Sequence, residues 1–179
     1  MQTVPENEQN TVAAVFKSHE GAEAAVKQLD AAGVDMRKLS IIGRGYEREQ
    51  KVLGYYTTGE RMKDWAKRGA LWGGVWGWLI GLAMFVIPGL GAVAIAGPIV
   101  PALLSALRGA VVVGGASALG AGLVGLGIPK DSVIQYEEAI KADQFVLVVN
   151  GTADEVSRAR EILSRTQPLS LEEHVAVPA

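Results

Sequence analysis

Two histidines are the side chains in this sequence with the widest catalytic and metal-binding chemistry, and they lie near its opposite ends. Neither His19 nor His174 has neighbours at metal-ligand spacing, and the chain contains no cysteine. A structural or catalytic zinc site needs three or four such ligands. We therefore expect His19 at a helix start and His174 on an edge strand, both at the surface, and we predict no metal site.

Other chemical motifs are weak or missing. Gly43-Arg44-Gly45 follows an apolar run, but a dinucleotide-binding loop needs a third glycine that opens a helix, so a strand-ending turn is the better interpretation. Basic residues do not alternate with aromatic ones as on a nucleic-acid platform, and the net charge is only −2. We predict a protein that is not an enzyme, with no cofactor, no nucleic-acid partner and no identified small-molecule substrate.

The apolar residues concentrate in the middle of the chain. Residues 69–128 contain one charged side chain, Arg108, although the chain as a whole is 49% hydrophobic. Within this stretch, small residues recur at every fourth position, which places them on one face of a helix and allows a second helix to approach closely. We predict that these residues mediate self-association: Gly69, Gly73, Gly77 and Gly81 in a first helix, and Ala110, Gly114, Ala118 and Gly122 in a second.

The apolar stretch is long enough for three membrane passes. We nevertheless expect two helices, at about 61–87 and 102–127, because an odd number of crossings would place the two flanks of one domain on opposite sides of a membrane. Between the helices we expect a buried or re-entrant turn. Arg108 is expected at the distal end of this hairpin or facing a lumen, because a charge at a bilayer centre is unfavourable. Basic residues ahead of an apolar helix are typical of the cytoplasmic flank of a membrane span. The candidate membrane-interface residues are Arg61, Lys63, Trp65, Lys67 and Arg68.

The two flanks of the apolar stretch predict one split domain. Residues 11–60 suggest strands at 12–16, 39–43 and 52–57, with a helix that Ser18 caps and Gly33 ends. Residues 129–179 suggest a helix at 130–142, a buried strand at 145–149 and an edge strand at 173–177. Between these strands, Thr152 and Glu155 form a capping box that opens another helix.

This order predicts a ferredoxin-like βαββαβ sandwich of the α+β class, with 12–16 and 145–149 as its central strands. The inserted helical hairpin occupies 61–128. Residues 1–10 are polar and acidic, which favours a disordered tail over a cleavable secretory signal.

Seven short segments together resemble the domains of bacterial general-stress (heat-induced stress) proteins, related low-temperature-induced proteins and a widespread domain of unknown function. The similarity covers about residues 11–165 and implies a bacterial, stress-associated, membrane-associated protein, with no activity or cofactor to transfer. The segments are 16–26 (FKSHEGAEAAV), 39–43 (LSIIG), 54–56 (GYY), 72–77 (WGGVWG), 88–91 (PGLG), 109–115 (GAVVVGG) and 127–132 (GIPKDS).

Three functional hypotheses follow from these patterns. The leading one is a homo-oligomeric structural protein in the bacterial inner membrane, with the ferredoxin-like domain in the cytoplasm and the exposed strand at 173–177 as a second association surface. The second is an oligomeric channel or pore. The third is a cytoplasmic particle in which the apolar hairpins are buried by protein rather than lipid.

Overall fold

Two apolar strands from opposite ends of the chain pair in the interior of the sheet. The computed structural model describes residues 10–44, 83–87, 90–109 and 117–175. In it, β1 (Asn10–Phe16) runs antiparallel to β5 (Phe145–Gly151), with Val12 opposite Val149 and Phe16 opposite Phe145. This pairing confirms the prediction that these two segments are central.

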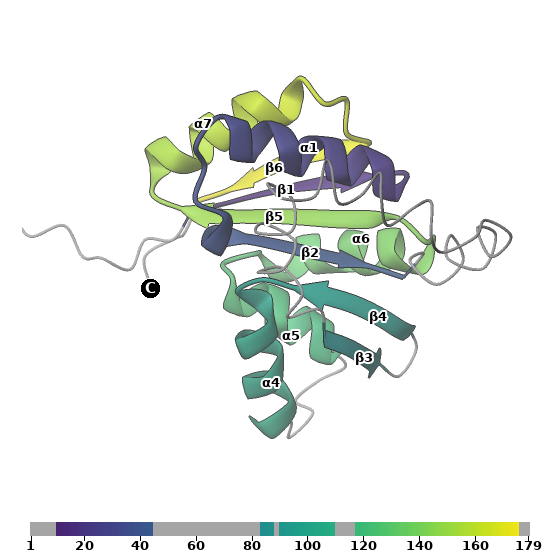
Figure 1. Cartoon of the computed structure of the whole chain (residues 1–179). Coiled ribbons are helices and arrows are strands. Elements are labelled where there is room, and N and C mark those ends of the chain that lie inside the picture. Colours follow the sequence, from purple (N-terminus) through teal and green to yellow (C-terminus); the bar gives the residue numbers. More distant parts are fainter. Residues whose placement is uncertain (1–9, 45–82, 88–89, 110–116, 176–179) are drawn as a thin grey trace, which may run out of the picture.

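The described strands form one antiparallel sheet in the order β3-β4-β2-β5-β1-β6 (Figure 1). β2 (Leu39–Gly43) pairs with β5, and β6 (Ser170–His174) pairs with β1. Strands β3 (Ala83–Ile87) and β4 (Gly91–Ala96) form a hairpin that joins the sheet beside β2. The protein is therefore an α+β fold.

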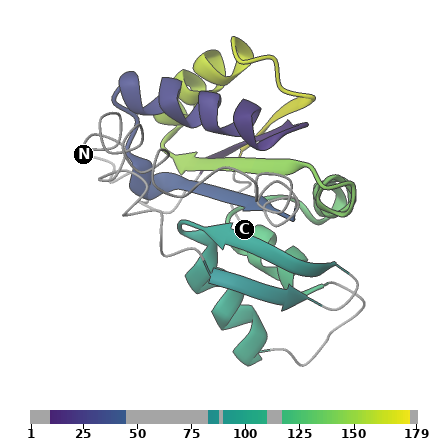
Figure 2. The same cartoon turned by 45° about the vertical axis from the view of Figure 1, so that its right-hand side comes forward.

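Helices cover both faces of this sheet (Figures 1 and 2). One face packs against α1 (His19–Ala31) and α7 (Ala153–Ser164), and the other packs against α4 (Ile99–Gly109), α5 (Ala118–Gly125) and α6 (Lys130–Lys141). A short 3₁₀ helix, η1 (Met36–Lys38), precedes β2. Because strand side chains alternate between faces, β1 contributes to both cores.

The local signals in the flanks are confirmed by the structure. Ser18 accepts a hydrogen bond from Gly21 N and caps α1, while Gly33 takes a φ of 77° just after that helix. Thr152 and Glu155 form the expected capping box of α7. The edge strand, predicted at 173–177, is instead β6 at Ser170–His174, because pairing with β1 starts earlier: Leu169 N donates to Val15 O over 2.7 Å.

The expected pair of long helices is wrong over the described part of the apolar stretch. The end of the first predicted helix, 83–87, is strand β3, and the predicted turn contains strand β4. Both strands consist of apolar residues that suit a sheet, and β2 offers them an edge with which to pair. Residues 61–82 and the predicted strand at 52–57 lie outside the described residues.

The second predicted helix, 102–127, is also divided. α4 begins at Ile99, whose N–H donates to the Ser40 side chain of β2, and Pro101 is tolerated because it lies in the first turn. A new helix, α5, then starts after Ser117, which caps it through Gly120 N. Gly127, with a φ of 87°, follows the end of α5.

Candidate functional site

Most of the residues predicted for self-association or membrane contact fall outside the described residues. This applies to the whole first ladder, Gly69, Gly73, Gly77 and Gly81, and to Ala110 and Gly114 of the second. It also applies to the predicted membrane-interface residues Arg61, Lys63, Trp65, Lys67 and Arg68. Arg108 lies near the C-terminal end of α4.

Two small residues of the second predicted series, Ala118 and Gly122, are described, and both contribute to packing within the domain. Gly122 is buried, and a Cβ atom at this position would lie 3.5 Å from the Cα of Leu103 in α4. Ala118 packs against the apolar core that lies between the sheet and helices α4, α5 and α6. At Gly122 the neighbouring helix is therefore α4 of the same chain, and association with another copy through this residue stays a prediction.

We use the term apolar lobe for β3, β4, α4 and α5. Among the residues of these four elements, only Arg108 is charged. The buried side of the lobe includes Val93, Ile99, Leu103 and Leu123, each fully buried against the sheet or the neighbouring helices. Its outer side leaves Leu104 40% exposed on α4 and Val124 38% exposed on α5. An exposed surface with so few charges is a candidate site for association.

A second candidate site is a polar cluster at the other end of the sheet, formed by Thr11, Tyr136, Asn150, Glu172 and His174. Thr11 of β1 lies opposite Asn150 on one side and His174 on the other. Opposite residues of antiparallel strands share a face, and Glu172 shares it with His174 because the strand period is two. Tyr136 reaches this row from the buried stripe of α6.

Tyr136 connects α6 to both polar residues of β6. Its hydroxyl lies 2.9 Å from His174 Nε2 and donates to Glu172 Oε2 over 3.3 Å. A hydroxyl has one proton, so donation to the carboxylate leaves the Tyr136 oxygen to accept a hydrogen bond from His174. This assigns to His174 the tautomer that carries its proton on Nε2. Gln135 Nε2 also donates to Glu172, over 2.7 Å. The cluster therefore attaches the edge strand to the helix through hydrogen bonds in series.

Burial shapes the acid–base behaviour of this cluster. It raises the pKa of the Tyr136 hydroxyl, and the nearby Glu172 carboxylate raises it further, so the tyrosine stays protonated. Burial lowers the pKa of His174, with partial opposition from the Glu172 charge. These residues are suited to holding a hydrogen-bond network around the Glu172 carboxylate rather than to supplying a tyrosinate base.

The other half of the polar cluster joins the loop after α5 to the sheet. Thr11 Oγ1 donates to Leu126 O over 2.6 Å, and Asn150 Nδ2 donates to both Thr11 Oγ1 and Leu126 O over 2.8 Å. Asn150 Oδ1 is buried and accepts no hydrogen bond from the described residues. A buried acceptor of this kind suits one ordered water molecule.

The expectation that His174 lies at the surface is wrong, because only 8% of its area is exposed. The spacing of Glu172 and His174, two residues apart on a strand, was the available signal that they share a face. His19 does begin α1 as predicted, where its ring meets the Phe145 ring edge-on at a centroid distance of 5.6 Å.

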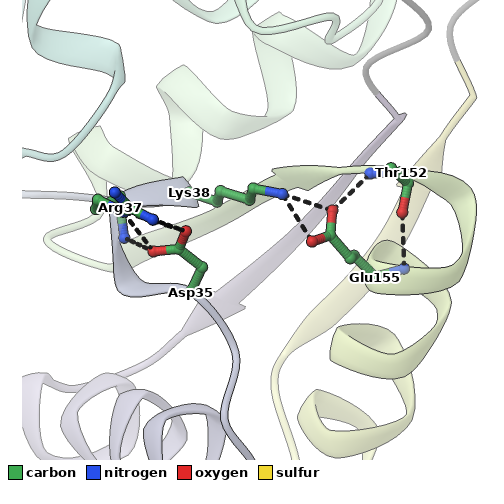
Figure 3. Close-up of polar contacts among 5 residues, drawn as sticks. All are labelled: Asp35, Arg37, Lys38, Thr152 and Glu155. Carbon is green, nitrogen blue, oxygen red and sulfur yellow. Dashed lines mark hydrogen bonds and ion pairs between the residues drawn. The ribbon is translucent and has the colours of Figure 1, made fainter. Parts of the chain in front are cut away.

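An ion pair links the two sequence halves of the domain (Figure 3). Lys38, at the end of η1, donates to both carboxylate oxygens of Glu155, each over 2.7 Å. Glu155 also accepts from Thr152 N as part of the capping box. Hydrogen bonding to Lys38 is the main reason that the pKa of Glu155 is lowered. Beside it, Arg37 and Asp35 form a more local pair. This arrangement is suited to stabilising the fold.

Metal-binding groups, membrane-spanning helices and similar proteins remain to be considered. Within the described ranges, histidine, aspartate and glutamate side chains form no group of three that could hold a metal ion. Among those same residues, no helix has the length and hydrophobicity to cross a membrane. Comparison with protein-family models, with curated proteins and with solved structures found no match.

Proposed function

We propose that this protein is a non-enzymatic structural protein whose copies associate through the apolar lobe. The observation that carries the proposal is the outer surface of α4 and α5, where Leu104 and Val124 are exposed on elements that contain one charged residue between them. Protein surfaces that bind other proteins are depleted in charge at their centres.

We infer in addition that the flanks form a ferredoxin-like domain into which the lobe is inserted. Strands β2-β5-β1-β6, with α1 and α7 on one face, have the order expected of two interleaved strand–helix–strand units. The insertion extends this sheet with a hairpin and packs α4 and α5 against its other face. Membership of the bacterial general-stress group stays a prediction from the sequence.

Native mass spectrometry of the purified chain tests the proposed association. Replacing Leu104 and Val124 together by glutamate places two negative charges on the lobe of each copy, so we expect the oligomer to dissociate into monomers. The matched control is Ile134→Glu, since Ile134 is a 62% exposed apolar residue on α6, outside the lobe. A wild-type chain that is monomeric at micromolar concentration would refute the proposal.

Membrane association is the second candidate. Residues 61–68 are rich in lysine and arginine and precede the apolar run at 69–82, a sequence pattern that favours an inner-membrane location with the domain in the cytoplasm. The described part of the apolar stretch favours the alternative of a cytoplasmic particle, because Leu103, Leu119 and Leu123 are buried by protein. Membrane extraction separates the two: a bilayer protein needs detergent to leave the membrane fraction, and a particle does not.

A further inference from the structure

The two outermost strands of the described sheet differ sharply in charge. β6 has the sequence Ser-Leu-Glu-Glu-His, and the side chains of Glu172 and His174 are tied to α6 by hydrogen bonds with the Tyr136 hydroxyl. β3 has the sequence Ala-Met-Phe-Val-Ile, with neither a charge nor a proline. Natural edge strands usually carry lysine, glutamate or proline because these residues discourage pairing with another chain. Only β6 has this protection.

Within the part of the chain that the structure describes, β3 has a strand neighbour on one side only. It pairs with β4 from Ala83 opposite Ile95 to Ile87 opposite Gly91. The backbone N–H and C=O groups along its other side need hydrogen-bond partners wherever water is excluded. Hydrocarbon cannot supply them, whereas another strand can. This requirement favours a protein partner over a lipid one at this edge.

A second copy of the chain is the partner with matching chemistry. Two β3 strands related by a two-fold axis run antiparallel and satisfy each other's backbone groups, and such an interface is self-complementary. No like charges meet there, since β3 and β4 are both uncharged. The same pairing through β6 would bring Glu172 and Glu173 of two copies close together, which is unfavourable.

We propose that β3 pairs with β3 of a second copy, so that one antiparallel sheet continues across a symmetric dimer. This inference rests on the proposed self-association and adds the surface that performs it. The exposed residues Leu104 and Val124 belong to the same lobe as the dimer edge. The geometry of the pairing makes the two ends of the sheet distinguishable by distance measurements.

Spin labels can measure that geometry directly, because the chain has no native cysteine. Ala92→Cys labels an exposed position of β4, and Val175→Cys labels a position 63% exposed just after β6. With strands about 4.8 Å apart, the two β4 strands of the dimer lie roughly 14 Å from each other and the two β6 strands roughly 50 Å. Pulsed and continuous-wave electron paramagnetic resonance should therefore give a distance below about 25 Å for position 92 and a long one for position 175.

The effect of two lysine substitutions on the dimer dissociation constant provides the second measurement. Val86 lies opposite the exposed Ala92 in the β3–β4 register, so Val86→Lys adds a charge to the neutral edge. We expect it to raise the dimer dissociation constant at least tenfold, while Glu173→Lys at the other edge leaves that constant within twofold. Both variants should give the circular dichroism spectrum of the wild type, a measurement that checks whether each keeps the fold.

The outcomes separate this inference from the proposed function. A monomeric wild-type chain overturns both. An oligomer with a short distance at 175, or with long distances at both positions, overturns the β3 pairing and leaves self-association standing. An oligomer with a short distance at 92 alone, weakened by Val86→Lys, supports the continuous sheet.

Discussion

Two glycines of α5 should respond differently to substitution by alanine. Gly122 and Gly120 lie two residues apart in one helix, and neither has a positive φ. Alanine in place of glycine within a helix stabilises it by about 0.5–1 kcal/mol, because glycine loses more conformational entropy on folding. What differs between the two positions is the space beside each Cα atom.

At Gly122, the added methyl group would lie 3.5 Å from Leu103 Cα and 3.6 Å from Ile99 Cγ1, which are ordinary contact distances. Gly122→Ala should therefore keep the full helix gain and raise the melting temperature by roughly 1–4 °C, given about 2–4 °C per kcal/mol for a chain of this size. At Gly120, the methyl group would lie 3.0 Å from Val133 Cγ1 and 3.1 Å from Glu137 Oε1. Val133 is buried and Glu137 is held by the Ser117 hydroxyl, so neither moves away freely.

We expect Gly120→Ala to be neutral or destabilising by up to about 1 kcal/mol, in the range of mild overpacking. Thermal and urea unfolding followed by far-ultraviolet circular dichroism measure both variants. Native mass should stay the same in Gly122→Ala, because this glycine faces α4 of its own chain. Equal shifts in the two variants, or a change of oligomer size in Gly122→Ala, would contradict the described packing of α5 between α4 and α6.

Three further predictions concern the polar contacts. Tyr136→Phe leaves the buried His174 ring without its hydroxyl partner and should destabilise the fold by about 1–3 kcal/mol in urea unfolding, whereas Gln135→Ala, which alters an exposed contact to the same Glu172, should cost under about 1 kcal/mol. Because the pKa of His174 is lowered in the folded state, the unfolded state binds the proton more readily. The stabilisation that neutral His174 gives to the fold is therefore present above about pH 6.5 and is lost as the pH falls through the folded-state pKa. His174→Gln should flatten the dependence of the unfolding free energy on pH between pH 7.5 and 5.5. Thr152→Ala should cost about 1 kcal/mol through loss of the cap of α7, while Lys38→Met should cost under about 1 kcal/mol because Lys38 and Glu155 are both more than a third exposed.

Local sequence signals were sufficient for the flanking elements. Ser18, Gly33 and the Thr152–Glu155 capping box each act within one helical turn, so their effect is visible in the sequence itself. The strand at 145–149 is β-branched and continuous, which left little ambiguity. The pairing of the first and last thirds of the chain then followed from the alternation of strands and helices.

The apolar stretch could not be resolved in the same way. Short apolar runs do not distinguish a strand from a buried helix, and spacing of small residues by four favoured the helix. The decision depends on a distant segment: β4 forms where β2 offers hydrogen bonds, with Ile41 opposite Ala96. Gly97 then follows β4 with a φ of 97°, in a place where a Cβ atom would collide with the Leu39 carbonyl. That close approach is visible only once the strands are paired.

The contrast between the two sheet edges also limits how the proposed dimer can grow. A protein with two neutral edges would add copies at both ends and form open fibrils. In the sheet formed by the described strands, the β3 edges would be consumed at the two-fold axis and the β6 edges would face outward. Each of those edges carries Glu172 and Glu173, and Tyr136 fixes it against α6. Pairing through β3 should therefore close at two copies, and removing the charges of β6, rather than strengthening β3, is the change that should convert the dimer into a longer assembly.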